Sequence, residues 1–359
     1  MKVPVNIPLV GKEEIAEVTA ILKAGALTTA AKDGGKNVQE FEKQVCSLVK
    51  SKYAIAVNSG TAALQAALYA LDIKSGDEVL LPSFTFVATA NSIVSVGAKP
   101  VFVDIRKDNY TMNPDDLARK ITKKTKAIMP VHLYGNVAYI DEILEIANKK
   151  NIPVIEDAAQ SMGSTYKGKQ TGNFSEMGCF SLYAAKVMTS GEGGVITTSD
   201  EKLREKLLMI RNHGMVHGYD TRILGLNLRL PEINAAIAKI QMKKLSGFLQ
   251  KRAQNAKMLT ELLQGADITL PIPRKHEKVN WYLYTIASKN RDRISKALNE
   301  NNIGATVYYG TPVHQTPFYN QKTKLPNTEW AAKNVLSLPV QPKVTRKNLE
   351  TTAKIIKNL

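Results

Sequence analysis

Between residues 53 and 198, short apolar runs alternate with segments that have one apolar helical face. This alternation restricts the fold more than any other feature of the chain. The runs have the length of buried strands, and turn-forming or helical residues separate them. They are residues 53–57, 79–81, 99–104, 126–131, 152–155, 177–182 and 195–198. Strands and helices in this alternation predict an α/β domain, in which helices cover both faces of a mainly parallel sheet.

A long helix follows this region and divides the chain. Pro231 stands where proline is favoured at the start of a helix, and the helical pattern continues past Leu245. We expect a large domain at 1–244, with residues 11–50 mostly helical, and a smaller C-terminal α/β domain at 245–359. The elements expected in the smaller domain are strands 281–284 and 306–309 and helices near 293–301 and from 346.

The composition is that of a globular protein, with 44% hydrophobic and 23% charged residues. The two cysteines, Cys46 and Cys179, lack the spacing of a metal or redox site, so we expect no metal and a reducing compartment. The N-terminus has no signal-peptide pattern, and no apolar run reaches the ~18 residues of a membrane span. We therefore expect a cytoplasmic protein without membrane contact.

The net charge of +17 raises the question of a nucleic-acid partner. The lysines are scattered over predicted helix faces, and no basic arm or repeat of basic and aromatic residues stands out. We therefore expect no nucleic-acid partner. A positive surface would also attract a substrate that carries a diphosphate.

Asp157 and Lys186 are the pair that points to chemistry. Asp157 follows one buried apolar run, and Lys186 follows another in a loop that leads to the glycine-rich segment 191–194. A lysine amine can form the Schiff base of pyridoxal phosphate, and a carboxylate can keep its ring nitrogen protonated. Ser181, five residues before Lys186, could bind the phosphate. A plainer interpretation stays open, in which Lys186 is a solvated surface lysine and Asp157 a turn or cap residue.

The turn Asn58-Ser59-Gly60-Thr61 lies between the strand at 53–57 and a helix at 62–71. Backbone N–H groups at such a turn, together with the helix dipole, favour an anion. Asn58 or Ser59 could equally be an ordinary helix cap, and a cap turn can also bind a phosphate.

The chain resembles the DegT-type sugar aminotransferases, which are pyridoxal-phosphate enzymes of the aspartate-aminotransferase fold (fold type I). The resemblance covers nearly the whole chain and implies a seven-stranded, mainly parallel sheet in the large domain. The segments that carry it are 41–42 with 57–64, 82–86, 131–135, 156–160, 180–194 and 211–214.

The resemblance assigns roles around the cofactor ring. Lys186 would form the Schiff base and later move the proton between substrate and cofactor, while Asp157 would pair with the ring nitrogen. Gln160 would reach the ring hydroxyl, and Phe86 would stack on the ring. Simple core packing is the alternative for Phe86.

The resemblance also assigns a phosphate site that needs two subunits. Gly60, Thr61 and Ser181 would bind the phosphate within one chain. Asn227 matches an asparagine that reaches the phosphate in the neighbouring subunit, which implies a homodimer; a loop cap is the alternative.

On the substrate side the match is with the family's substrate-facing loop, at residues 308–319. It makes Tyr308 and His314 candidates for substrate binding. The chain departs from the family at the insertion 32–36, which we expect near the sugar or the dimer partner, and at Leu226 and Leu228, where tyrosines are more usual.

The resulting expectation is a pyridoxal-phosphate-dependent aminotransferase that moves an amino group from L-glutamate to a nucleotide-linked keto sugar. The N-terminal pattern, a glycine followed by paired acids and a helix ending near Ala24-Gly25, favours amination at sugar C4 over C3. The alternatives are an aminotransferase for a cyclitol or another ketone, and a cofactor-binding regulator without turnover. Lys186 argues against the regulator, because regulation needs no proton carrier.

Overall fold

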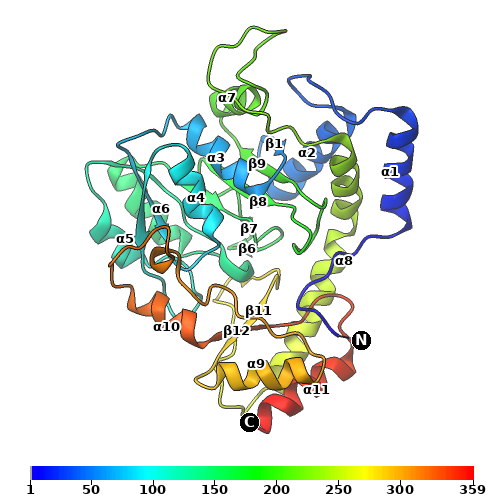
Figure 1. Ribbon diagram of the computed structural model, residues 1–359, viewed down its shortest axis with the longest axis vertical. Coiled ribbons are helices and arrows are strands. Elements are labelled where there is room, and N and C mark those ends of the chain that lie inside the picture. Colours follow the sequence, from blue (N-terminus) through cyan, green and yellow to red (C-terminus); the bar gives the residue numbers. More distant parts are fainter. Residues whose placement is uncertain (1) are drawn as a thin grey trace.

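A seven-stranded sheet forms the centre of the computed structural model, which describes residues 2–359 (Figure 1). Four strands pair in the order β1–β9–β8–β5 and three in the order β3–β2–β4, and parallel bridges between residues 128 and 154 and between 131 and 157 join β4 to β5. Only β9 runs antiparallel to the other six. The strands are β1 (Tyr53–Val57), β2 (Glu78–Pro82), β3 (Lys99–Val103), β4 (Thr125–Ile128), β5 (Ile155–Asp157), β8 (Met177–Ser181) and β9 (Gly194–Thr198). The predicted mainly parallel, helix-covered sheet is confirmed.

Helices cover both faces of the sheet because successive strand residues point to opposite sides. In β1, Ile55 and Val57 pack with α3, α4 and α7, whereas Ala54 and Ala56 pack with α2 and α8. A further cluster joins α5 and α6 to β2, β3 and β4. These helices are α2 (Lys36–Val49), α3 (Gly60–Ala70), α4 (Val87–Ser95), α5 (Pro114–Lys120), α6 (Ile140–Lys150), α7 (Glu201–Arg211) and α8 (Glu232–Leu262).

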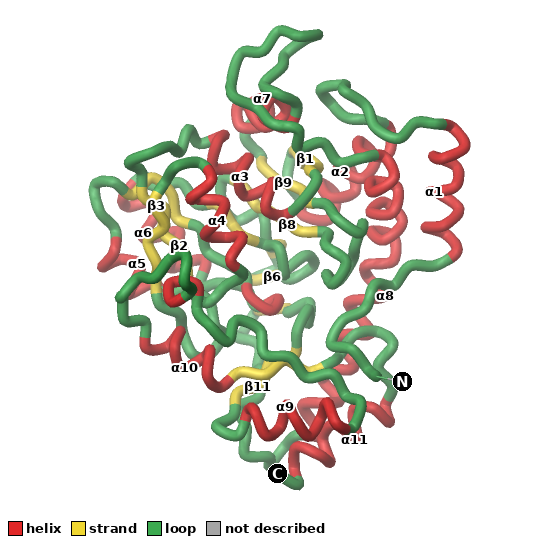
Figure 2. Tube along the Cα trace, viewed as in Figure 1, coloured by secondary structure: helices red, strands yellow, loops and turns green. Residues whose placement is uncertain are grey.

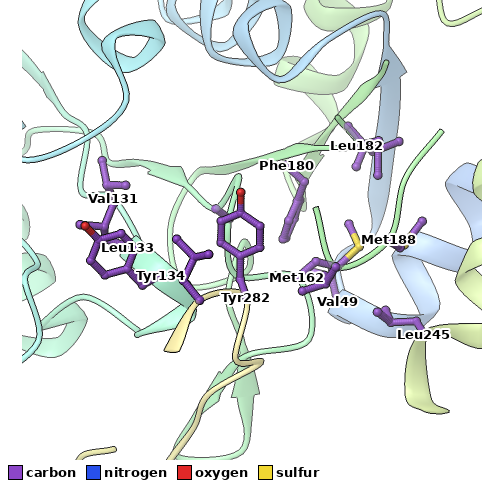
Figure 3. Packing of buried hydrophobic residues seen from close by; sticks show 14 of the residues in the cluster. Val49, Val131, Leu133, Tyr134, Met162, Phe180, Leu182, Met188, Leu245 and Tyr282 are labelled. Atoms are coloured by element: carbon purple, nitrogen blue, oxygen red, sulfur yellow. The ribbon is translucent and has the colours of Figure 1, made fainter. Parts of the chain in front are cut away.

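The core between the sheet and helices α2 and α8 lies directly under the loop that carries Lys186. Figure 3 shows Phe180 of β8 beside Met162, with Val49 of α2 and Leu245 of α8 in the same cluster. Met188, two residues after Lys186, is buried in this cluster as well. Close apolar packing therefore holds the loop that carries Lys186 in place.

The N-terminal helix α1 (Lys12–Ala24) packs on α8 (Figure 2). Glu14 is buried at this contact, and both its carboxylate oxygens lie 2.8 Å from Lys244 Nζ. Lys244 and backbone Gly11 N–H lower the pKa of Glu14 against the opposing effect of burial, so the pair stays charged. The prediction that residues 11–50 are mostly helical is confirmed.

α8 runs from beside the main sheet to the end of the molecule where α9 and α11 lie (Figure 1). There β11 pairs antiparallel with β12 and packs with α8, α9 and α11 around a separate core. The elements are β11 (Tyr284–Ala287), α9 (Arg291–Glu300), α10 (Pro326–Asn334), β12 (Val335–Leu338) and α11 (Arg346–Lys357). The predicted boundary between residues 244 and 245 falls inside α8 and stays a prediction.

Short elements complete the described chain, and none of its helices is long and apolar enough to cross a bilayer. A small sheet joins β10 to β6 and β6 to β7, and two 3-10 turns follow β4 and precede α10. They are β6 (Thr165–Tyr166), β7 (Lys169–Gln170), β10 (Glu277–Lys278), η1 (Leu133–Gly135) and η2 (Val313–Gln315).

Two strand predictions in the C-terminal part are wrong. Trp281 has a φ of +54° and interrupts the expected strand 281–284, so β11 begins only at Tyr284. Tyr309 has a φ of +62°, and the expected strand 306–309 is reduced to a single bridge at Thr306. Residues in this left-handed region cannot continue an extended strand.

Candidate active site

A cavity of about 490 Å³ opens at the carboxyl ends of β1, β2, β5 and β8. Ligands of parallel α/β sheets collect at this edge. The polar and aromatic residues that line it are Ser59, Gly60, Thr61, Thr85, Phe86, Thr89, Asp157, Gln160, Ser181, Tyr183, Lys186 and Glu192. Every residue predicted to bind the cofactor lines this cavity except Asn227.

Asp157 is the last residue of β5, and its carboxylate is buried at the floor of the cavity. Thr89 Oγ1 of α4 donates to Oδ2 over 2.8 Å, and the backbone N–H of Ala159 donates to Oδ1 over 3.2 Å. Burial raises the pKa of Asp157, while these two donors oppose the rise. Within residues 2–359 no cation lies in ion-pair distance of this carboxylate, so it can pair with a cationic group in the cavity.

Lys186 lies in the loop between β8 and β9, where its backbone N–H donates to Tyr183 O over 2.9 Å. Its Nζ lies 4.8 Å from the ring centroid of Tyr282 and has no ion-pair partner in the described chain. Burial lowers the pKa of Lys186 to about 8, against the opposing effect of Asp157. With this pKa about a tenth of the amine is neutral at pH 7, far more than for an ordinary lysine, and the neutral amine can act as a nucleophile and a base.

The start of α3 and the end of β8 form an anion site. The side chain of Ser59 caps α3 by accepting from the N–H of Ala62, and the N–H groups of Gly60 and Thr61 have no acceptor inside the helix. A Cβ on Gly60 would lie 2.7 Å from Cβ of Ser181, so only glycine allows this approach. Free amides, the helix dipole and the Ser181 hydroxyl suit a phosphate.

Gln160 and Phe86 lie on the remaining walls. Gln160 Oε1 accepts from the N–H of Tyr134 over 2.8 Å, and its Nε2 donates to Tyr309 Oη over 2.9 Å. Phe86 directly precedes α4 and is 58% exposed, so its ring is free to cover a planar ligand.

These groups fit pyridoxal phosphate. The cavity brings together a half-buried lysine amine, a buried carboxylate without a cation, an anion site at a helix start and an exposed aromatic ring. They correspond to the cofactor's aldehyde, ring nitrogen, phosphate and ring face. Lys186, Asp157, Ser181 and the first turn of α3 would hold it.

Three of the predicted binding residues lie outside this cavity. Asn227 is exposed, and its carbonyl accepts from Asn58 Nδ2 over 3.2 Å. Tyr308 is half-buried, and His314 is fully buried with its Nδ1 2.7 Å from Ser83 Oγ. Their predicted roles in binding stay predictions.

The insertion 32–36 lies against α7 of the same chain and does not line the cavity. Arg211 Nη2 donates to the carbonyl of Lys32 over 2.7 Å, and Lys32 Nζ pairs with Glu205 at 2.5 Å. Its predicted place near the sugar or the partner subunit stays a prediction.

Several cavity residues escaped the prediction from the sequence, namely Thr85, Thr89, Tyr183 and Glu192. One signal could have found Thr89, because a threonine four residues after Thr85 stands on the same face of a helix that follows a strand end. The contact of Tyr282 with Lys186 has no sequence signal, since 96 residues separate them (282 − 186).

The fold and the cavity define a pyridoxal-phosphate-dependent aminotransferase. The chain belongs to the DegT/DnrJ/EryC1/StrS aminotransferase family, whose model matches residues 8–357. The family resemblance, the cofactor and the enzyme class predicted from the sequence are thereby confirmed.

Relatives with a named activity come from several bacteria. The UDP-N-acetyl-3-dehydro-alpha-D-glucosamine 3-aminotransferase of Acidithiobacillus ferrooxidans is 37% identical, over 90% of this chain and 88% of the relative. The crystal structure of S. venezuelae DesV with a ketimine intermediate has a TM-score of 0.93 at 32% identity, covering 99% of this chain and 98% of that one. A candidate sugar aminotransferase from Streptococcus pneumoniae, in its PLP form, has a TM-score of 0.94 at 26% identity, covering 100% and 98%.

Proposed function

We propose that this chain transfers the amino group of L-glutamate to a keto sugar carried on a nucleoside diphosphate. The observation that carries the proposal is that two groups line one cavity, Lys186 with a pKa lowered to about 8 and the buried Asp157 without a cation. The name of the Acidithiobacillus relative, which acts on a UDP-linked keto sugar, supports the substrate class. The net charge of +17 favours an anionic substrate.

The residues divide the chemistry among them. Pyridoxal phosphate supplies, when bound, a carbonyl for amino groups and an electron sink in its ring. Asp157 would hold a proton at the ring nitrogen, because a buried carboxylate stabilises a cation beside it. The Lys186 amine would remove and return the proton at the reacting carbon of the substrate.

The most specific part of the proposal is which sugar carbon receives the nitrogen. The N-terminal pattern around Gly11 and Glu13-Glu14 favours C4. The Acidithiobacillus relative is named for C3, so the two kinds of evidence point to different carbons. NMR spectra of the amino-sugar product identify the aminated carbon directly.

The remaining parts of the proposal concern binding and assembly. We expect a cytoplasmic homodimer in which Asn227 of one subunit contacts the phosphate bound by the other. Tyr308 and His314 would act on the sugar side. Because His314 is fully buried, it would act by holding Ser83 and the loop after β2, not by touching the sugar.

The test is the visible absorbance of the purified protein before and after L-glutamate is added. A yellow band that bleaches with glutamate and returns with a nucleotide keto sugar supports the proposal. We expect the band to be absent in Lys186→Ala and unchanged in Lys347→Ala, an exposed lysine of α11. Bleaching that only a cyclitol or another simple ketone reverses would assign that substrate class instead. Bound cofactor that no amino donor bleaches would indicate the regulator.

A further inference from the structure

Tyr309 connects the C-terminal part of the chain to the cavity. Its ring stacks on Tyr134, with centroids 6.2 Å apart at 11°, and meets Phe84 edge-on at 5.7 Å. Both tyrosines have a φ of +62°, a conformation that costs energy for aromatic residues and persists where the surroundings fix it. Tyr309 is therefore held in one place from two sides.

The side-chain amide of Gln160 has only one orientation that satisfies its neighbours. The backbone N–H of Tyr134 can only donate, so the atom that it meets at 2.8 Å must be the oxygen, Oε1. Nε2 is then the atom 2.9 Å from Tyr309 Oη, and because an amide nitrogen only donates, the tyrosine oxygen accepts.

An amide nitrogen carries two hydrogens in a fixed plane, so binding one of them directs the other. Tyr309 takes one hydrogen of Nε2. The second has no acceptor within residues 2–359, and Gln160 lines the cavity, so this hydrogen is available to a ligand there. Without the Tyr309 oxygen, Gln160 would keep a single anchor, the N–H of Tyr134, and its amide plane could rotate.

We propose that Tyr309 is a positioning residue, whose hydroxyl fixes Gln160 so that the second hydrogen of Nε2 is available to the ring oxygen of the cofactor. This inference rests on the proposed role of Gln160 at that oxygen. Tyr309 thereby makes the cofactor site depend on the C-terminal segment, which the chain reaches only 149 residues after Gln160.

A donor at the ring oxygen has a spectroscopic consequence. It stabilises the ionised oxygen most when the neighbouring Schiff-base nitrogen has lost its proton, because that nitrogen then no longer shares a proton with the oxygen. The donor therefore lowers the pKa of this nitrogen, which visible absorbance reports in the resting holoenzyme without turnover.

The experiment compares Tyr309→Phe, Gln160→Ala and the double variant with the wild-type holoenzyme. In Tyr309→Phe we expect pyridoxal phosphate to bind about fivefold more weakly, as for one lost hydrogen bond, and the pKa seen by absorbance to rise. Tyr134→Phe is the matched control. It removes a buried hydroxyl that has no hydrogen-bond partner in the described chain and leaves the N–H of Tyr134 on Gln160.

The double variant separates positioning from general stability. If Tyr309 acts through Gln160, adding Tyr309→Phe to Gln160→Ala changes neither the affinity nor the absorbance pKa further. Gln160→Glu, which still accepts at Tyr134 but cannot donate into the cavity, should raise the same pKa with Tyr309 intact. Additive effects in the double variant, or a Tyr309→Phe holoenzyme with the spectrum of Tyr134→Phe, would overturn the proposal. A normal pKa in Gln160→Ala would overturn it as well, while the response to glutamate tests the proposed function separately.

Discussion

Replacing Thr89 with valine tests how the chain keeps Asp157 charged. Valine has nearly the shape of threonine but cannot donate, so the change removes the 2.8 Å hydrogen bond to Asp157 Oδ2 and leaves the packing of α4 in place. Asp157 then keeps only the 3.2 Å bond from the N–H of Ala159. Thr85, whose hydroxyl lies 2.9 Å from that of Thr89, loses its partner too.

The size of the effect follows from the charge and burial of the acceptor. A hydrogen bond to a charged group contributes about 1.5–3 kcal/mol, which corresponds to a loss of about 10-fold to 100-fold in affinity for pyridoxal phosphate. The sign of the pH dependence is also fixed. Burial already raises the pKa of Asp157 and Thr89 lowers it, so removing Thr89 raises this pKa further. As the solution is acidified, the affinity for pyridoxal phosphate should therefore begin to fall at a higher pH in Thr89→Val than in the wild type.

The assay is a titration of the cofactor-free protein with pyridoxal phosphate, followed by absorbance from mildly alkaline to mildly acidic pH. Thr89→Ser is the control, because it keeps the hydroxyl and loses only a methyl group. If Thr89→Val binds the cofactor as tightly as Thr89→Ser at every pH, the hydrogen bond does not maintain the charge of Asp157 and the reasoning fails.

Three further predictions concern other parts of the site. Glu156→Gln should destabilise the protein by about 3–5 kcal/mol in thermal or denaturant unfolding. The reason is that the buried carboxylate accepts from His132 and from the N–H groups of Gly172, Phe174 and Ser175. A variant that unfolds like the wild type would contradict this. Gly60→Ala should weaken cofactor binding by forcing Ser181 away, whereas Gly247→Ala in α8, which has open space, should leave it unchanged; equal binding in both would argue against the close approach. Lys186→Met should stabilise the cofactor-free protein by about 3 kcal/mol at neutral pH, since a pKa of about 8 against 10.5 makes the charged lysine costly in this site below pH 8. That gain should disappear as the pH rises from about 8 to about 10.5, and a gain independent of pH would point to packing instead.

The parts of the site that the sequence predicts are those that lie near a strand end. Asp157, Ser181 and Gly60 each follow or close a buried apolar run, and parallel strands bring such positions to one edge. Local pattern and edge geometry together were sufficient for them. Lys186 does not stand at a strand end, and its place follows from the loop between β8 and β9.

The parts that the sequence did not predict depend on contacts between distant segments. Tyr282 and Tyr309 reach the site through left-handed backbone at Trp281 and at Tyr309 itself, and β-rich composition around them suggested strands instead. Aromatic residues favour strands on average, and here tertiary packing overrides that preference. No local signal marks Trp281 or Tyr309 for a positive φ, which among non-glycine residues is more frequent in Asn, Asp and His.

The antiparallel direction of β9 explains how one lysine meets one carboxylate. In a fully parallel sheet, a crossover helix would return the chain from the carboxyl end of β8 to the opposite edge. Because β9 runs antiparallel, residues 182–193 instead form a loop that stays at the carboxyl edge, and this loop carries Lys186. Pairing of Ser181 with Gly194, and of Gly194 with Val57, places the ends of β8 and β1 on either side of the start of β9. One reversed strand therefore adds the lysine loop to the edge where the parallel strands already bring the phosphate turn and the end of β5.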